Sequence, residues 1–148
     1  MEEGKFLLVA PSVKQAVTIC LLEDDPSVIK ATSRLLSSDG WNVESFLDPL
    51  VFLDYAHSRH PEVVVMDICM PAMNGLEVQT RLRTISPVTR VVVLTANDDP
   101  AVRSKATSAG ASAFLIKPAD DEEFFSAIES AAATRKSVVF SANQKRKE

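Results

Sequence analysis

Long apolar runs are missing from this chain of 148 residues. No stretch approaches the ~18 apolar residues that a membrane helix requires, so we expect no membrane contact. The opening residues are acidic on balance, and the first apolar run, residues 6–10, is too short for the core of a secretory signal. Only two cysteines are present, Cys20 and Cys69. A disulfide scaffold is therefore excluded, and we expect reduced thiols in the cytoplasm.

Glycine is also scarce, with four residues in the whole chain. Neither of the glycine-rich loops that hold nucleotide phosphates is present, and there is no GxSxG nucleophile elbow. Positive charge is not in excess either, because the formal net charge is −4. Direct nucleic-acid binding by this domain is therefore not expected.

The hydrophobic residues, 46% of the chain, gather in short runs that are typical of buried strands. The clearest runs cover residues 17–22, 63–66, 91–94 and 113–116. Residues 41–46 alternate more, as a strand nearer an edge does. Asp-Pro pairs at residues 25–26, 48–49 and 99–100 predict helix starts, because Asp is a good N-cap and Pro is tolerated at the first helical position.

Strand and helix thus alternate five times, which predicts an α/β domain with a parallel sheet covered by helices on both faces. The length fits one such domain. We assign residues 17–134 to it, residues 1–16 to an N-terminal extension, and residues 135–148 to a C-terminal tail or the start of a linker.

Polar side chains follow four of the predicted strands, at the edge where ligands of open parallel sheets bind. They are Glu23, Asp24 and Asp25 after the first strand, Asp67 after the third, Thr95 after the fourth and Lys117 after the fifth. Each of these residues alone is more simply explained as a capping or solvated loop residue, and we expect Asp25 to be the N-cap of the first helix. Together, clustered carboxylates without His or Cys partners suit Mg²⁺, and the lysine and hydroxyl suit a phosphoryl group. Asp67 is the candidate acceptor, because a carboxylate can form an aspartyl phosphate.

Four segments around these strand ends carry a family resemblance. In chain order they are Leu22–Asp25, Val65–Gly75, Leu94–Ala96 and Phe114–Pro118. Together they resemble the receiver domain of two-component response regulators, over residues 17 to about 134. The resemblance implies a single doubly wound, flavodoxin-like (βα)₅ domain with strand order 2-1-3-4-5.

The resemblance also implies roles for individual residues. Asp67 would be the phosphoacceptor, and Mg²⁺ would be bound by Asp24, by Asp67 and by the backbone carbonyl of Cys69, with Glu23 acting through a metal-bound water. Thr95 would bond a phosphate oxygen. Lys117 would pair with the acyl phosphate, and the Lys117–Pro118 peptide would be cis. Before phosphorylation, we expect Lys117 to pair with the nearby acids close to the surface, which would stabilise the domain by about 1 kcal/mol.

Three further positions would tune the response. Phe114 occupies an aromatic switch position where Tyr is frequent, although its ring also suits an ordinary core residue. Cys69 and Asn97 would lie beside the water that hydrolyses the phosphorylated state. Because a thiol orients water poorly, we expect slow to moderate hydrolysis.

The implied function is a phosphorylation-dependent signalling switch. We do not expect an enzyme, except that the domain would catalyse its own Mg²⁺-dependent phosphorylation and dephosphorylation. A histidine kinase or phosphotransfer protein would phosphorylate Asp67. The face formed by the fourth helix, fifth strand and fifth helix would then control an output domain or effector outside this chain, or form a homodimer.

Three alternatives stay open at this stage. A pseudo-receiver would keep the fold as an interaction module without the chemistry, although every key position here holds a competent residue. An aspartate-nucleophile phosphatase of the haloacid-dehalogenase type needs DxDxT, whereas Cys69 stands where the second Asp belongs. A flavodoxin-like electron carrier needs a hydroxyl-rich loop after the first strand, where this chain has acids.

Overall fold

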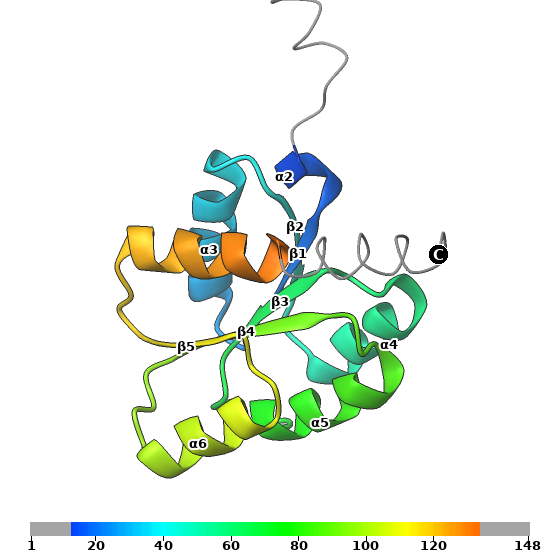
Figure 1. Ribbon diagram of the computed structural model, residues 1–148, viewed down its shortest axis with the longest axis vertical. Coiled ribbons are helices and arrows are strands. Elements are labelled where there is room, and N and C mark those ends of the chain that lie inside the picture. Colours follow the sequence, from blue (N-terminus) through cyan, green and yellow to red (C-terminus); the bar gives the residue numbers. More distant parts are fainter. Residues whose placement is uncertain (1–12, 134–148) are drawn as a thin grey trace, which may run out of the picture.

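A five-stranded parallel sheet forms the centre of the structure, a computed structural model that describes residues 13–133 (Figure 1). Its strands lie in the order β2-β1-β3-β4-β5, which confirms the predicted doubly wound, flavodoxin-like topology. The strands are β1 (Thr18–Leu22), β2 (Asn42–Phe46), β3 (Val63–Met66), β4 (Arg90–Thr95) and β5 (Ala113–Ile116). The predicted tail, residues 135–148, lies outside the described residues, as does most of the predicted extension.

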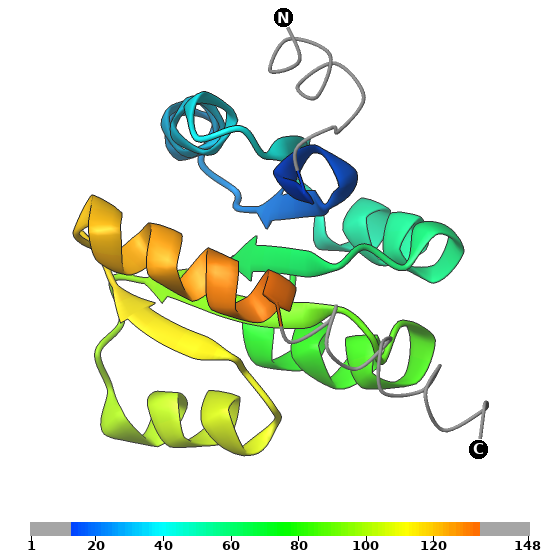
Figure 2. The same ribbon diagram turned by 45° about the horizontal axis from the view of Figure 1, so that its top comes forward.

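Helices cover both faces of the sheet, as Figure 2 shows. They are α2 (Val13–Ala16), α3 (Pro26–Ser38), α4 (Pro49–Arg59), α5 (Gly75–Ile85), α6 (Pro100–Ser108) and a last helix that is described over residues 121–133. One core cluster contains buried side chains of α4, α5 and α6, and the other contains side chains of α3 and the last helix. Two helical layers therefore enclose the sheet.

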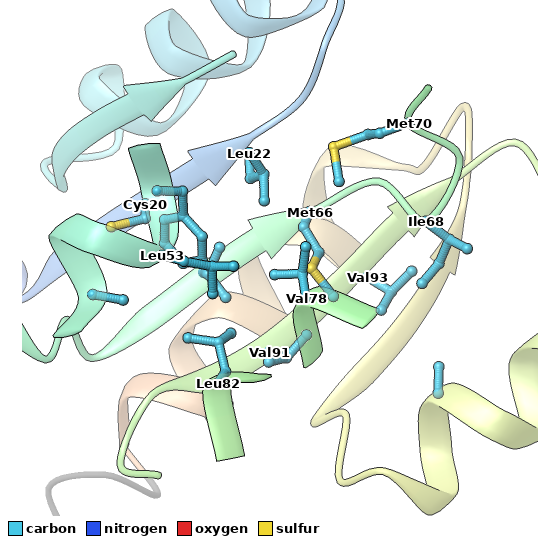
Figure 3. Packing of buried hydrophobic residues seen from close by; sticks show 14 of the residues in the cluster. Cys20, Leu22, Leu53, Met66, Ile68, Met70, Val78, Leu82, Val91 and Val93 are labelled. Carbon is cyan, nitrogen blue, oxygen red and sulfur yellow. The ribbon is translucent and has the colours of Figure 1, made fainter. Parts of the chain in front are cut away.

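The strands are buried on both faces, which explains why their sequences do not alternate. In β1, Cys20 and Leu22 belong to one core cluster, whereas Ile19 and Leu21 belong to the other. In Figure 3, Met66 and Val91 on neighbouring strands face side chains of α5. Strand β2 is at an edge of the sheet and more exposed, as its alternating sequence predicts.

The three Asp-Pro pairs begin α3, α4 and α6, as predicted. The carboxylates of Asp25, Asp48 and Asp99 each accept a hydrogen bond of 2.9 Å from the backbone N–H two residues later. Gly40 and Gly110 follow α3 and α6 with φ of 95° and 99°, which only glycine adopts without strain. These local signals fix where each helix meets the sheet.

The described end of the predicted N-terminal extension contacts the rest of the domain. Residues 13–16 form α2, and Lys14 Nζ lies 3.1 Å from Asp39 Oδ2 and 5.4 Å from the centre of the Trp41 ring. This short helix therefore packs on the loop between α3 and β2. No helix within residues 13–133 is both long and apolar enough to span a membrane.

Candidate functional site

The carboxyl ends of β1, β3, β4 and β5 bring the predicted polar residues to one edge of the sheet. Leu22 pairs with Met66, and Asp67 N–H donates to Leu22 O at 3.3 Å, which extends the ladder by one residue. Thr95 pairs with Ile116, and Lys117 N–H donates to Thr95 O at 2.8 Å. The register of the strands thus places the residues that follow them side by side.

The ammonium of Lys117 joins two of the acids. Lys117 Nζ donates to Glu23 Oε1 at 2.9 Å and to Asp67 Oδ2 at 3.2 Å. The two carboxylate side chains are only 11% exposed, whereas Lys117 is 25% exposed. The Lys117–Pro118 peptide is cis, as predicted. One cation is therefore shared by two largely buried carboxylates.

Burial and charge act against each other in this cluster. Burial raises the pKa of the Glu23 carboxyl above its usual value, although the adjacent Lys117 ammonium acts in the opposite direction. Burial alone would lower the pKa of Lys117, but its bond to Glu23 and the charges of Asp67 and Glu23 outweigh burial and raise it. Lys117 is therefore firmly protonated at neutral pH.

The loop after β3 holds the second oxygen of Asp67. The Cys69 N–H donates to Asp67 Oδ1 at 3.0 Å, so both carboxylate oxygens have partners. At the end of the same loop, Gly75 N–H donates to Ile68 O at 2.8 Å. A Cβ on Gly75 would lie 2.9 Å from both Asp67 O and Ile68 Cα, so the close approach of α5 to this loop requires glycine.

Thr95 and Asn97 organise the loop between β4 and α6. Thr95 is fully buried, and its Oγ1 accepts a hydrogen bond from Asn97 N–H at 3.2 Å. Asn97 Oδ1 accepts from Asp99 N–H at 3.0 Å, and Asn97 Nδ2 lies 3.6 Å from Cys69 Sγ. Asn97 therefore connects the start of α6 to the loop that carries Asp67, and the two predicted tuning residues are in contact.

One predicted metal ligand stands apart from the buried group. Asp24 is exposed, and nowhere in residues 13–133 are three or more His, Cys, Asp or Glu side chains arranged to hold a metal ion. The donor chemistry still fits Mg²⁺, which is commonly held by one or two carboxylates, several waters and a substrate phosphate. Glu23, Asp24 and Asp67 supply such hard oxygen donors on adjacent strand ends.

Phe114 on β5 occupies an inward position. Its ring is 8% exposed and belongs to the core cluster under α4, α5 and α6. The guanidinium carbon of Arg103 on α6 lies 5.4 Å from the ring centre, within the range of a cation–π contact. Sequence reasoning missed Arg103, because nothing in the α6 sequence indicates which residue would face β5.

Replacing Lys117 with Met should destabilise the chain in a pH-dependent way. At pH 8 the variant leaves the two largely buried acids side by side without their shared ammonium. We expect a loss of about 2 kcal/mol, below the roughly 3–5 kcal/mol of a fully buried pair because Lys117 is 25% exposed. At pH 5 the loss should be smaller, because the pKa of Glu23, already raised, rises further without the ammonium and the carboxyl takes up a proton. Urea unfolding at the two pH values measures the difference.

Lys105→Met provides the control, because Lys105 is an exposed residue of α6. It removes the same charge and should change the free energy of unfolding little at either pH. An equal loss for Lys117→Met at pH 5 and pH 8 would show that packing of the lysine stem, rather than its charge, stabilises this edge.

Comparison with known proteins identifies the family to which this chain belongs. A family model described as the response regulator receiver domain matches residues 19–129. The response regulator TodT of Pseudomonas putida is 34% identical over 117 residues, which are 79% of this chain and 52% of TodT. The response regulator MprA of a Mycobacterium species is 37% identical over 107 residues, 72% of this chain and 46% of MprA. The chain thus spans about half the length of these curated relatives.

Solved structures agree with this match. The chemotaxis protein CheY4 of Vibrio cholerae superposes with a TM-score of 0.72 and 25% identity, over 78% of this chain and 98% of CheY4. With the strand order and the polar strand ends already described, these matches show that the chain belongs to the response regulator receiver domains, the signalling domains of two-component systems.

Proposed function

We propose that this receiver domain is a switch that accepts a phosphoryl group on Asp67 from a histidine kinase or a phosphotransfer protein. The observation that carries the proposal is the position of Asp67. It is a largely buried acid at the end of the central strand β3, held by the Lys117 ammonium and the Cys69 N–H. Clustered carboxylates without such a cation would repel one another.

In the proposed step, an Asp67 carboxylate oxygen attacks the phosphorus of a phosphohistidine. A P–O bond forms as the donor's P–N bond breaks, and the released electron pair and a proton go to the histidine nitrogen. Mg²⁺ would neutralise the charge on the transferring group. Asp24, Asp67 and the backbone carbonyl of Cys69 would hold the ion, and Glu23 would act through a metal-bound water.

Two residues would respond to the new charge. Lys117 would exchange one of its carboxylate partners for a phosphoryl oxygen, because an ammonium pairs strongly with a phosphate. Thr95, whose hydroxyl accepts the Asn97 N–H at 3.2 Å, would donate its own proton to the phosphoryl group. Movement of Thr95 would then move the loop to which Asn97 belongs.

The loop leads into α6, which is anchored weakly. Ala106 is the buried residue of this helix, and Val102 is only partly buried against the core. Small anchors bury little apolar area, at about 25 cal/mol per Å², so α6 can shift at low cost. We propose that the face formed by α6, β5 and the last helix changes on phosphorylation, and that the buried ring of Phe114 changes its position beneath this face. This face would control an output domain or effector, or form a homodimer.

Family membership narrows the alternatives. Receiver domains act in signalling, so the phosphatase and electron-carrier readings are not supported. A phosphorylation-independent pseudo-receiver remains the second candidate, because it would have the same fold. The intact acceptor, cation and hydroxyl at positions 67, 117 and 95 favour the switch.

Phosphorylation should be confined to Asp67 and depend on Mg²⁺. After incubation with acetyl phosphate and Mg²⁺, intact mass spectrometry should show the mass of one added phosphoryl group in the wild type and none in Asp67→Asn. Asp25→Asn is the matched control, because it makes the same change in charge on the same rim while Asn also caps a helix. Phosphate on Asp24 or on a serine would refute the assignment.

The lifetime of the phosphorylated state should depend on position 69. Asn orients water better than a thiol does, so Cys69→Asn should speed the decay of the phosphorylated state by more than about twofold. The decay is measured as the loss of the added mass over time. Cys69→Ala controls for loss of the contact with Asn97 and should not speed it. Equal decay in Cys69→Asn and the wild type would contradict this role.

A further inference from the structure

The contact between Arg103 and Phe114 joins a helix to the sheet. Helix α6 packs against β5, which is an edge strand (Figure 2). The guanidinium carbon of Arg103, in the first turn of α6, lies 5.4 Å from the centre of the Phe114 ring, and Phe114 is only 8% exposed. Phe114 pairs with Val93 in the ladder between β4 and β5. Its backbone is therefore fixed to the sheet, whereas Arg103 belongs to a weakly anchored helix.

No carboxylate competes with the ring for this guanidinium group. Within residues 13–133, Arg103 forms no ion pair. A cation over the face of an aromatic ring is attracted by the electron density of that face. Phe114 has no hydroxyl through which to bond to a neighbour, as Tyr would. The cation is therefore the charged group of α6 that acts directly on the position of this ring.

A series of hydrogen bonds connects Arg103 to the phosphorylation site. The Asn97 N–H donates to Thr95 Oγ1 at 3.2 Å, and Asn97 Oδ1 accepts from the Asp99 N–H at 3.0 Å. The Arg103 N–H in turn donates to Asp99 O at 3.0 Å. A displacement of Thr95 and of the loop after it therefore moves the first turn of α6, and Arg103 with it.

The other end of α6 is held in place. Ala106 is fully buried, and its carbonyl oxygen accepts a hydrogen bond of 2.8 Å from Gln79 Nε2 on α5. Gln79 is itself only 1% exposed, so this bond is sheltered from water. Movement of the first turn is therefore a tilt of the helix about its buried end. Such a tilt changes the position of Arg103 relative to Phe114.

We propose that the contact between Arg103 and Phe114 is autoinhibitory: it stabilises the resting state, in which Asp67 carries no phosphoryl group. The inference rests on the proposed function, because it requires a phosphorylated state in which α6 has moved. The contact exists without a phosphoryl group, and the tilt of α6 weakens it. An interaction that is stronger in one of two states shifts the equilibrium towards that state. Arg103 is thus a positioning residue that acts on the switch through Phe114.

Loss of the contact should strengthen binding at the distant Asp67 site. When the resting state predominates, the apparent affinity for an acyl-phosphate mimic falls with the small fraction of molecules in the changed state. Removing a cation–π contact at an exposed position raises that fraction about two- to fivefold. Arg103→Gln should therefore bind beryllofluoride about two- to fivefold more tightly than the wild type. Loss of a positive charge by itself acts in the opposite direction, because beryllofluoride is an anion.

Titration of the whole chain with beryllofluoride tests the proposal. Mg²⁺ is kept saturating, and binding is followed through the amide NMR signals of residues 66–69 and 95–103. Lys105→Gln is the matched control, because Lys105 is an exposed residue of the same helix and the change removes the same charge. This control should bind no more tightly than the wild type.

A double-mutant cycle assigns the effect to the ring. Phe114→Leu removes the aromatic face and keeps an apolar side chain, so Arg103→Gln should have no further effect on the affinity in that background. Urea unfolding of each variant is measured in parallel, because a merely structural role of Arg103 would change the free energy of unfolding and leave the affinity unaltered. If Phe114→Leu does not fold, the surface variants at positions 103 and 105 still test the proposal.

The possible results separate this inference from the function on which it rests. Equal or weaker binding by Arg103→Gln than by the wild type would overturn the autoinhibitory role, as would an equal gain in Lys105→Gln, while the proposed function would stand. Failure of the wild type to bind beryllofluoride would overturn the proposed function, and this inference with it. A gain that is confined to Arg103→Gln and disappears in the Phe114→Leu background is the result expected.

Discussion

The organisation of the site depends on one shared cation. Lys117 bonds to both Glu23 and Asp67, at 2.9 and 3.2 Å, and without it two largely buried carboxylates would face each other. Lys117 lies 94 residues after Glu23 and 50 residues after Asp67 in the chain, so only the order of the strands brings the three together. The fold thus supplies the charge balance that two largely buried carboxylates require, at the carboxyl edge of the sheet.

Much of this could be predicted from the sequence because the signals are local. Asp-Pro pairs specify helix starts through the cap and the missing N–H, and strands apolar on both faces specify a covered parallel sheet. Polar residues directly after such strands must then share one edge. The positions of Asp67, Thr95 and Lys117 and the choice of Asp67 as candidate acceptor follow from this reasoning alone, whereas the strand order and the roles of the other residues came from family resemblance.

Other features depend on side-chain geometry that a sequence does not contain. Lys117 was expected in a near-surface pair, yet its partners are only 11% exposed, so its contribution to stability should exceed that expectation. Asp24 has the same chemistry as Glu23 but is exposed. The contact of Arg103 on α6 with Phe114 on β5 depends on which residue of the helix faces the strand, and the sequence does not specify this.

The central claim is that a phosphoryl group on Asp67 acts on the α6–β5 face and not only on its own pocket. Amide hydrogen exchange, measured with Mg²⁺ in the presence and absence of beryllofluoride as an acyl-phosphate mimic, tests this most directly. The account predicts changed protection across residues 97–117, together with changes around Asp67. Changes confined to the Asp67 pocket, with residues 97–117 unaltered, would contradict it.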